Sequence, residues 1–310
     1  MVDTRTGADE RLRRPGRLRS LRLGDTTVTF VPDGSIQGRP RAWLPDTTEA
    51  FWAAHPQYLD ATGHLVASLG GLLVEHGDRA LLIDTGFGPH TSPADPATPN
   101  GAVRGGALLR NLAELGREPG TLEAVAFSHL HPDHLGWAVR PAPDGRPLFA
   151  PAVHLVAEPE WAGGAPGEAA ALAPHVRTVT DGEEVFPGVR ARITGGHSPG
   201  HTEFVITGGG TRLIAFGDSL HSPVQADRPE WSCVYDHDPA LAADHRRRLV
   251  AELAEPDTIG FGVHFADAVF GRIATDGRGP AWRPLETDPA DGHRADGHRR
   301  APAGEAGQGT

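Results

Sequence analysis

The chain has 310 residues, of which 38% are hydrophobic and 22% charged, as is typical of a globular protein with a substantial core. A formal net charge of −11 argues against general affinity for nucleic acid or an anionic membrane surface. The single cysteine, Cys233, excludes an intrachain disulfide, and no run of about 18 apolar residues predicts a membrane span. With no signal-peptide pattern at the Arg-rich start, we expect a cytoplasmic protein that acts on a small molecule.

The two ends of the chain differ in composition from its middle. Residues 1–20 are rich in arginine and predict a disordered basic arm. Residues 287–310 are polar and rich in Gly and Pro, and predict a disordered tail. No linker or repeat interrupts the part between them, so we expect one domain over residues 21–286.

Short apolar runs alternate with turn residues along this domain. They predict strands over residues 21–32, 67–75, 79–84, 124–128, 153–157, 191–194, 203–207 and 213–216. His76-Gly77-Asp78 and Gly208-Gly209-Gly210 each separate two such runs and predict two hairpins.

Two helices are predicted from apolar spacing. Leu108, Leu112 and Leu115 follow i, i+4, i+7 spacing, and Gly116 marks an end. Asp238-Pro239 marks the start of the second helix, which we expect to bury one face and to expose another to solvent. The buried face is Leu241, His245, Leu249 and Leu253, and the exposed face is Arg246, Arg247 and Arg248. Strand hairpins interspersed with helices indicate an α/β protein with mixed sheets.

The stretch SHLHPDHLGW, residues 128–137, crowds metal-binding side chains together. His129 and His131 are two residues apart in extended chain, so both can point to one side. Pro132 suits the first turn of a helix, which would direct Asp133 and His134 elsewhere. This cluster therefore predicts two pairs of ligands facing two adjacent positions.

Three further candidate ligands follow predicted strands at distant positions: His197, Asp218 and His264. With the four residues of the cluster they make seven. Two metal ions with three terminal ligands each and one bridging carboxylate would use all seven.

Five stretches in this order resemble the metallo-β-lactamase fold superfamily. They are LLIDTGFG (81–88), HLHPDH (129–134), GHSPGHT (196–202), GDS (217–219) and GVHF (262–265). The resemblance covers residues 21–285 and implies a four-layer αββα sandwich with mixed sheets. It also implies that two divalent ions are bound, zinc in first place with iron or manganese as alternatives.

The resemblance also implies a role for each ligand. His129, His131 and His197 would hold the first ion, Asp133, His134 and His264 the second, and Asp218 would bridge. Asp84 would orient a ligand histidine by a hydrogen bond. His201 would be structural.

Such a centre predicts a hydrolase in which a bridging hydroxide attacks the substrate and one metal stabilises the developing charge. The stretch over residues 218–249 resembles a subgroup with quorum-quenching lactonases and methyl parathion hydrolase-type enzymes. A small ester, most of all a lactone, is therefore the first choice of substrate. The alternatives are a phosphotriester, an acyl thioester and, in another class, metal-dependent oxidoreduction. A homodimer is common among such relatives.

Residues around the centre are candidates for substrate contact. His221 stands where acyl-homoserine lactonases have a tyrosine, so His221, with Asp133, is a candidate catalytic residue. If His221 does not face the cavity, it packs within its loop. The aromatic residues Trp43, Phe51, Trp52 and Trp231 either line a pocket or pack the loops onto the core.

Overall fold

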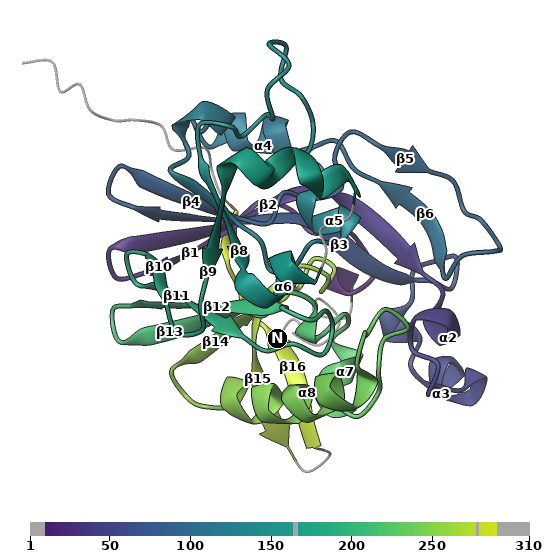
Figure 1. Cartoon of the computed structure of the whole chain (residues 1–310). Helices are drawn as coiled ribbons and strands as arrows, with labels where there is room; N and C mark the ends of the chain where they lie inside the picture. The colour runs from purple at the N-terminus through teal and green to yellow at the C-terminus, as the bar shows by residue number, and fades with distance from the viewer. Residues whose placement is uncertain (1–9, 164–166, 277–278, 290–310) are drawn as a thin grey trace, which may run out of the picture.

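A computed structural model describes residues 10–163, 167–276 and 279–289 of the chain (Figure 1). Its strands form two mixed sheets, and helices cover the outer surfaces of both. This arrangement confirms the four-layer αββα sandwich predicted from the sequence.

The first sheet has ten strands in the order β17-β1-β2-β3-β4-β7-β8-β9, with β6 and β5 added beside β2. They are β1 (Arg19–Leu23), β2 (Thr26–Gly38), β3 (Leu65–His76), β4 (Arg79–Ile83), β5 (Thr91–Ser92), β6 (Asn100–Arg104), β7 (Ala124–Ala126), β8 (Val153–Ala157), β9 (Val176–Val179) and β17 (Asp288–Pro289). The four strands β4, β7, β8 and β9 run parallel to one another.

The second sheet has seven strands in chain order, from β10 to β16. They are β10 (Glu184–Phe186), β11 (Val189–Ile193), β12 (Thr202–Gly208), β13 (Thr211–Ala215), β14 (Thr258–Phe261), β15 (Phe270–Asp276) and β16 (Gly279–Pro284). Among the described strand pairs of this sheet, β13 and β14 alone are parallel, and α8 connects them.

The described helices are short apart from α8. They are α2 (Pro40–Trp43), α3 (Glu49–Ala54), α4 (Leu108–Glu114), α5 (Pro132–Leu135), α6 (Glu158–Ala162), α7 (Val224–Asp227) and α8 (Pro239–Leu253), with 3-10 turns η1 (Pro56–Tyr58), η2 (Pro119–Thr121), η3 (Gly167–His175) and η4 (Gly217–Ser219). Helix α4 lies on the first sheet and α8 on the second (Figure 1).

The main core fills the space between the two sheets. Val28, Leu72 and Leu81 of the first sheet share it with Phe204 and Phe261 of the second, and all of them are buried. These positions alternate along their strands, so the other face of each strand is free to pack on the helices. Smaller clusters under α4 and α8 make up the outer layers.

Both predicted hairpins form, β3–β4 around Gly77-Asp78 and β12–β13 around Gly209-Gly210. One strand prediction was wrong: residues 21–32 do not form a single strand. Gly24 has a φ of 60°, in the left-handed region that favours glycine, and the chain turns there from β1 into β2. A Cβ at Gly24 would also lie 2.7 Å from the backbone nitrogen of Gly209.

The two predicted helices form as α4 and α8. Gly116 follows α4 with a φ of 72°, and the Asp238 carboxylate caps α8 by accepting a hydrogen bond from Leu241 N–H. Two of the residue assignments were wrong. Leu241 is 42% exposed, and Arg246 is fully buried rather than solvated.

The N-terminal arm departs from expectation where it is described. Residues 10–20 are not a free arm, because Arg14 and Arg19 bind the buried carboxylate of Asp267 at 2.8 and 2.7 Å. Arg19 also begins β1, which pairs with β17, so the expected tail joins the sheet at residues 288–289. Residues 1–9 and 290–310 lie outside the described part of the chain. A single domain over residues 21–286 stays a prediction.

We expect Asp267→Ala to lower the free energy of unfolding by about 3 kcal/mol, because it leaves a partly buried arginine without its counter-charge. Glu286→Ala is the matched control. Its side chain is 99% exposed and 3.9 Å from Arg11, so it should cost nearly nothing. Urea unfolding of both variants checks this, and equal stabilities would contradict the arm's anchoring role.

Within the described residues, no helix combines the length and the apolarity needed to cross a membrane.

The buried carboxylate of Glu203, on strand β12 and in contact with His245 of α8, predicts that the stability of the fold depends on pH. Burial alone would raise the pKa of Glu203, but hydrogen bonding to His245 and the charge of Arg192 lower it to about 2. A depressed carboxyl pKa stabilises the fold above the unfolded value, and this stabilisation is lost as pH falls from about 4.5 to about 2.

We therefore expect wild-type protein to lose on the order of 3 kcal/mol through Glu203 over that interval. Glu203→Gln should be less stable at pH 6 and should have a flatter profile below pH 4.5. Urea midpoints measured on both proteins between pH 6 and 2 check this, because other acid effects act on both. Parallel profiles would contradict it.

Candidate metal centre

The ends of the parallel strands bring distant residues to one edge of the sandwich. His129 and His131 follow β7, Asp218 follows β13, and His264 follows β14. The carboxyl ends of neighbouring parallel strands open at the same edge of a sheet. The two sheets face each other there, so loops from both converge.

The predicted local geometry of the histidine cluster is confirmed. His131 is extended and precedes α5, which begins at Pro132. His129 Nε2 and His131 Nδ1 lie 2.9 Å apart, so both rings point to one side. Helix α5 directs Asp133 and His134 toward a second position.

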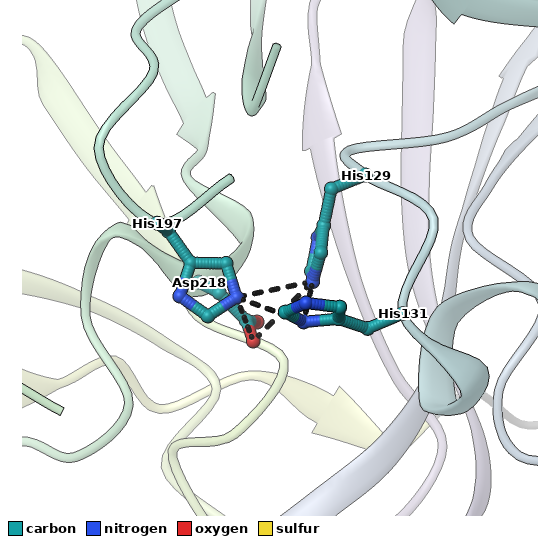
Figure 2. Close-up of side chains that lie close together, drawn as sticks. All are labelled: His129, His131, His197 and Asp218. Atoms are coloured by element: carbon teal, nitrogen blue, oxygen red, sulfur yellow. Dashed lines mark hydrogen bonds and ion pairs between the residues drawn. The ribbon is translucent and has the colours of Figure 1, made fainter. Parts of the chain in front are cut away.

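The first set of side chains meets at this edge. His197 Nε2 lies 3.2 Å from His129 Nε2 and 3.1 Å from His131 Nδ1, and Asp218 closes the group (Figure 2). Four donor atoms of these residues lie within 4.8 Å of one another, as the ligands of a single ion must.

The second set is joined to the first by Asp218. Its Oδ1 lies 3.2 Å from His134 Nε2 and 3.1 Å from His264 Nε2, and its Oδ2 lies 3.3 Å from His197 Nε2. Asp133 completes the second set, with Oδ2 3.6 Å from His264 Nε2. One oxygen of Asp218 thus faces each set, which is the geometry that a bridging carboxylate requires.

Hydrogen bonds behind the rings orient four of the histidines. The Nδ1 atoms of His134 and His197 lie 3.0 Å from Asp84 Oδ2 and 3.1 Å from Asp236 Oδ1. His264 Nδ1 lies 2.9 Å from the Ser68 carbonyl oxygen. An acceptor at Nδ1 places the proton there and leaves the Nε2 lone pair directed inward. His129 Nδ1 lies 3.1 Å from Ser128 Oγ, which is compatible with the same tautomer.

Burial and charge give this group a characteristic set of pKa values. Burial lowers the pKa of His197 to about 4 and that of His129 well below its usual value, so both rings are neutral at pH 7. Burial would also lower the pKa of His134, but the carboxylates of Asp218, Asp133 and Asp84 hold it well above its usual range. The three carboxylates therefore favour a positive charge at the position of His134.

The residues fit a pair of divalent cations. His134 Nε2 and Asp218 Oδ1 are buried, and among the described residues neither atom has a partner in hydrogen-bonding geometry, although the two lie 3.2 Å apart. Inward Nε2 lone pairs facing one another would repel, whereas a cation between them would bind each one. Imidazole and carboxylate are ligands that zinc, iron and manganese accept.

Asp84 lies where the sequence predicted it. Its carboxylate accepts hydrogen bonds from Ser128 N–H and Ser128 Oγ–H at 2.8 Å each, as well as from His134. The residue has a φ of 62°, a strained conformation for a residue other than glycine. Strain of this kind is found at functional sites, where the surrounding bonds hold it.

His201 is oriented away from ion binding. Its Nε2 accepts a hydrogen bond from Asp218 N–H at 3.0 Å, and its Nδ1 lies 2.9 Å from Thr194 Oγ1. Burial lowers its pKa to about 3, so the ring is neutral. With both nitrogens engaged, His201 supports the position of Asp218, in keeping with the structural role expected for it.

Three acidic residues that support the centre were missed in the sequence. Asp236 orients His197, and the buried Arg246 binds its other oxygen at 2.9 Å. Glu160 joins two ligand loops by accepting from Leu130 N–H and Gly200 N–H. Asp33 accepts from four backbone N–H groups in the loops at 87–88 and 106–108. No local pattern marks these residues, because each acts on a distant loop.

A cavity of about 370 Å³ opens onto the centre. Asp133, Asp218, His131, His221 and His264 are among the residues that line it. His221 thus faces the cavity, with Nε2 3.3 Å from Asp218 Oδ2. Neither of its ring nitrogens has a partner in hydrogen-bonding geometry within the described part of the chain.

The aromatic loop residues divide between the two expected roles. Trp43 lines the cavity, whereas Phe51, Trp52 and Trp231 pack together in a cluster beside it. Phe51 and Trp231 meet edge to face with ring centroids 4.8 Å apart. Phe87 and Tyr235 line the cavity and were not singled out in the sequence.

Two mixed sheets with helices outside, and two converging His/Asp sets at one edge, define a metal-binding protein of the α/β sandwich class. A sequence profile described as the metallo-beta-lactamase superfamily matches residues 72–262. The chain belongs to this superfamily.

Curated relatives and solved structures give more detail. An N-acyl homoserine lactonase of Bacillus thuringiensis is 30% identical in an alignment 149 residues long, which covers 43% of this chain and 56% of the relative. The match thus spans about half of that relative's length.

Two solved structures share the fold. AidC, a dizinc quorum-quenching lactonase solved with a product, superposes with a TM-score of 0.74 at 21% identity, covering 89% of this chain and 99% of its own. The hydrolase AbOPH superposes with a TM-score of 0.73 at 24% identity, covering 88% and 99%.

Proposed function

We propose that this protein is a dinuclear metal-dependent hydrolase of a small uncharged ester, with a lactone as the first choice. The observation that carries the proposal is Asp218, whose two oxygens face two ligand sets at the base of a cavity of about 370 Å³. Lactonases among the relatives support the proposal that the bond hydrolysed is the ester bond of a lactone.

Two divalent ions held by the seven residues would activate a water molecule and polarise the substrate carbonyl. The chain's own groups would then position the substrate. His221 and Asp133 both line the cavity. We assign His221 to hydrogen bonding with the carbonyl oxygen or the leaving oxygen, and Asp133 to both ion binding and substrate contact.

The lining of the cavity favours uncharged substrates. Ile36, Phe87 and Val103 supply apolar walls, and no arginine is among the described lining residues. Asp95 and Asp133 add negative charge. An anionic carrier thioester would find no counter-charge there, so the thioesterase alternative is weaker. A phosphotriester is uncharged and remains the second candidate. Zinc in both sites, a homodimer and a cytoplasmic location stay predictions.

Metal analysis followed by a substrate panel tests the proposal. We expect about two divalent ions per chain and turnover of lactones above that of aryl esters, thioesters and phosphotriesters. Dialysis against a chelator should abolish turnover, and added zinc should restore it. A protein with two ions bound that hydrolyses none of the panel would contradict the proposal. Redox-active iron with electron transfer would favour the oxidoreductase alternative.

A further inference from the structure

One wall of the cavity is a segment that the core does not hold in place. Residues 89–99, called the lid segment below, contain β5 and lead into β6 at the margin of the first sheet (Figure 1). Four of them line the cavity that opens onto the metal centre: Ser92, Pro93, Asp95 and Thr98. Residues 89–98 are nevertheless all exposed, and β5 pairs with β6 over two residues only. The position of this wall therefore depends on a few polar contacts.

A single buried carboxylate fixes the base of this wall. Asp33 Oδ2 accepts hydrogen bonds from Phe87 N–H and Gly88 N–H at 2.9 and 3.1 Å. Its Oδ1 accepts from Gly106 N–H and Leu108 N–H at 2.9 and 3.0 Å. Gly88 and Gly106 have φ angles of 86° and 115°, in the left-handed region that glycine adopts without strain. The chain thus leaves the body of the fold and rejoins it at one fixed point.

One side chain holds the outer part of the lid segment. The guanidinium of Arg39, the residue before α2, donates to the backbone oxygens of Asp95, Pro96 and Thr98 at 2.7, 3.0 and 2.6 Å. The backbone N–H of Arg39 donates to the Pro99 carbonyl oxygen at 3.0 Å. Within the described part of the chain, these are the side-chain hydrogen bonds that tie residues 93–98 to the rest of the fold. Arg39 therefore has the geometry of a latch.

The chemistry of the arginine side chain suits this contact. A guanidinium presents its donors in a rigid planar fork, so one group can bind several carbonyl oxygens at once. No carboxylate among the described residues forms an ion pair with Arg39, so its donors serve the lid segment. Trp43, at the other end of α2, lines the cavity and donates through Nε1–H to Asn100 Oδ1 at 2.8 Å, where β6 begins. Helix α2 and the residue before it thus hold both the outer part and the root of the wall.

A wall held by so few contacts can open at a small cost in free energy. Segments with little buried surface and exposed hydrogen bonds open locally more often than the core does. When a wall is in place for only part of the time, the apparent affinity for a group that binds against it falls in proportion. A group that contacts only the metal ions and the base of the cavity is not affected.

We propose that residues 89–99 form a lid over the metal centre and that Arg39 is the positioning residue that latches it. The latched lid is the wall against which the non-reacting arm of the substrate binds. Arg39 thereby sets the affinity for that arm without taking part in the chemical step. The kinetic part of this inference rests on the proposed hydrolase function, whereas the latch can be measured without a substrate.

The variant Arg39→Ala removes the three side-chain bonds and keeps the backbone N–H. Arg41→Ala is the matched control, because Arg41 lies two residues further along the chain, is 57% exposed and pairs with Glu49 at 3.1 Å. Hydrogen–deuterium exchange of the zinc-loaded proteins compares peptides from residues 89–105 with peptides from β3. We expect exchange in residues 89–105 of Arg39→Ala to be about tenfold faster, with β3 unchanged, and Arg41→Ala to match wild type in both.

Two lactones separate the wall from the metal centre. γ-Nonalactone carries an alkyl arm, and γ-butyrolactone has none. For γ-nonalactone we expect Arg39→Ala to raise KM about tenfold and to leave kcat within about threefold of wild type. For γ-butyrolactone kcat/KM should stay within about threefold, because no arm contacts the lid. Arg41→Ala should keep wild-type values for both.

Unchanged exchange in residues 89–105 of Arg39→Ala would overturn the latch. An equal rise in β3 would also overturn it, since Arg39 would then stabilise the whole fold rather than the lid. An equal loss of kcat/KM on both lactones would overturn the role of the lid in binding the arm. Wild-type protein that hydrolyses neither lactone would contradict the proposed function and the role in substrate binding, while faster exchange confined to residues 89–105 would still support the latch.

Discussion

Asp218→Ala is expected to abolish hydrolysis and to release metal from both halves of the centre. Its two oxygens face different ligand sets, Oδ1 at 3.1 Å from His264 Nε2 and Oδ2 at 3.3 Å from His197 Nε2. Loss of a residue behind a ligand lowers metal affinity or activity about 10–100-fold. A carboxylate shared by two ions should matter more, so we expect a loss in kcat/KM above about a thousandfold.

Metal content and activity measured together check this result. The fold is expected to persist, because His201 binds the backbone N–H of Asp218 and not its side chain. Far-UV circular dichroism serves as the control for folding. The metal content and kcat/KM of Asp218→Asn should lie between those of wild type and Asp218→Ala, since asparagine keeps the shape of the side chain and loses its charge. A folded Asp218→Ala protein with two ions and wild-type kcat/KM would refute the bridging role.

Arg246→Ala is expected to cost about 3–5 kcal/mol in the free energy of unfolding. Arg246 and the Asp236 side chain are both fully buried, and Arg246 Nη1 binds Asp236 Oδ2 at 2.9 Å. Its Nε and Nη2 also donate to the Pro229 carbonyl oxygen at 2.8 Å and the Ser232 hydroxyl at 3.0 Å. Removing the guanidinium leaves a buried carboxylate without its counter-charge.

Arg247→Ala is the matched control for this prediction. Arg247 is the next residue of α8, but its side chain is 52% exposed and forms an ion pair with Asp244, whose side chain is 63% exposed. We expect a change within about 0.5 kcal/mol. Denaturant unfolding at saturating zinc compares the three proteins. Equal stabilities for the two variants would show that the buried pair contributes little.

Arg246→Ala should also weaken metal binding at the centre. Asp236 orients His197 through its other oxygen, at 3.1 Å from His197 Nδ1. A carboxylate that has lost Arg246 is free to move, so the His197 ring is expected to lose part of its fixed orientation. The stability effect is therefore expected together with weaker metal binding.

Much of the centre could be predicted from the sequence because its ligands are local or follow strands. His129 and His131 project together from an extended stretch, and Pro132 begins the helix that turns Asp133 and His134 away. These relations depend on backbone conformation over a few residues, which residue type largely decides. The hairpins at Gly77 and Gly209 follow for the same reason.

The errors occurred where packing overrides local pattern. Arg246 has the composition of a solvated helix face, yet it is buried because Asp236 lies opposite. The arginine-rich composition of the N-terminal arm predicted disorder. Asp267, about 250 residues away along the chain, nevertheless binds Arg14 and Arg19. A counter-charge so distant along the chain leaves no signal in a local window.

Residue type and spacing by themselves predicted an α/β protein with mixed sheets, the seven candidate ligands and the two directions in which the cluster points, and the family resemblance added the four-layer sandwich. Only the tertiary structure decided that Asp218 faces both sets, that His221 lines the cavity, and that Asp236, Glu160 and Asp33 hold the loops. The physical reason is the distance along the chain over which each effect acts. Backbone preference acts between neighbours, whereas the position of a lone pair or a counter-charge depends on which distant strands the core brings together.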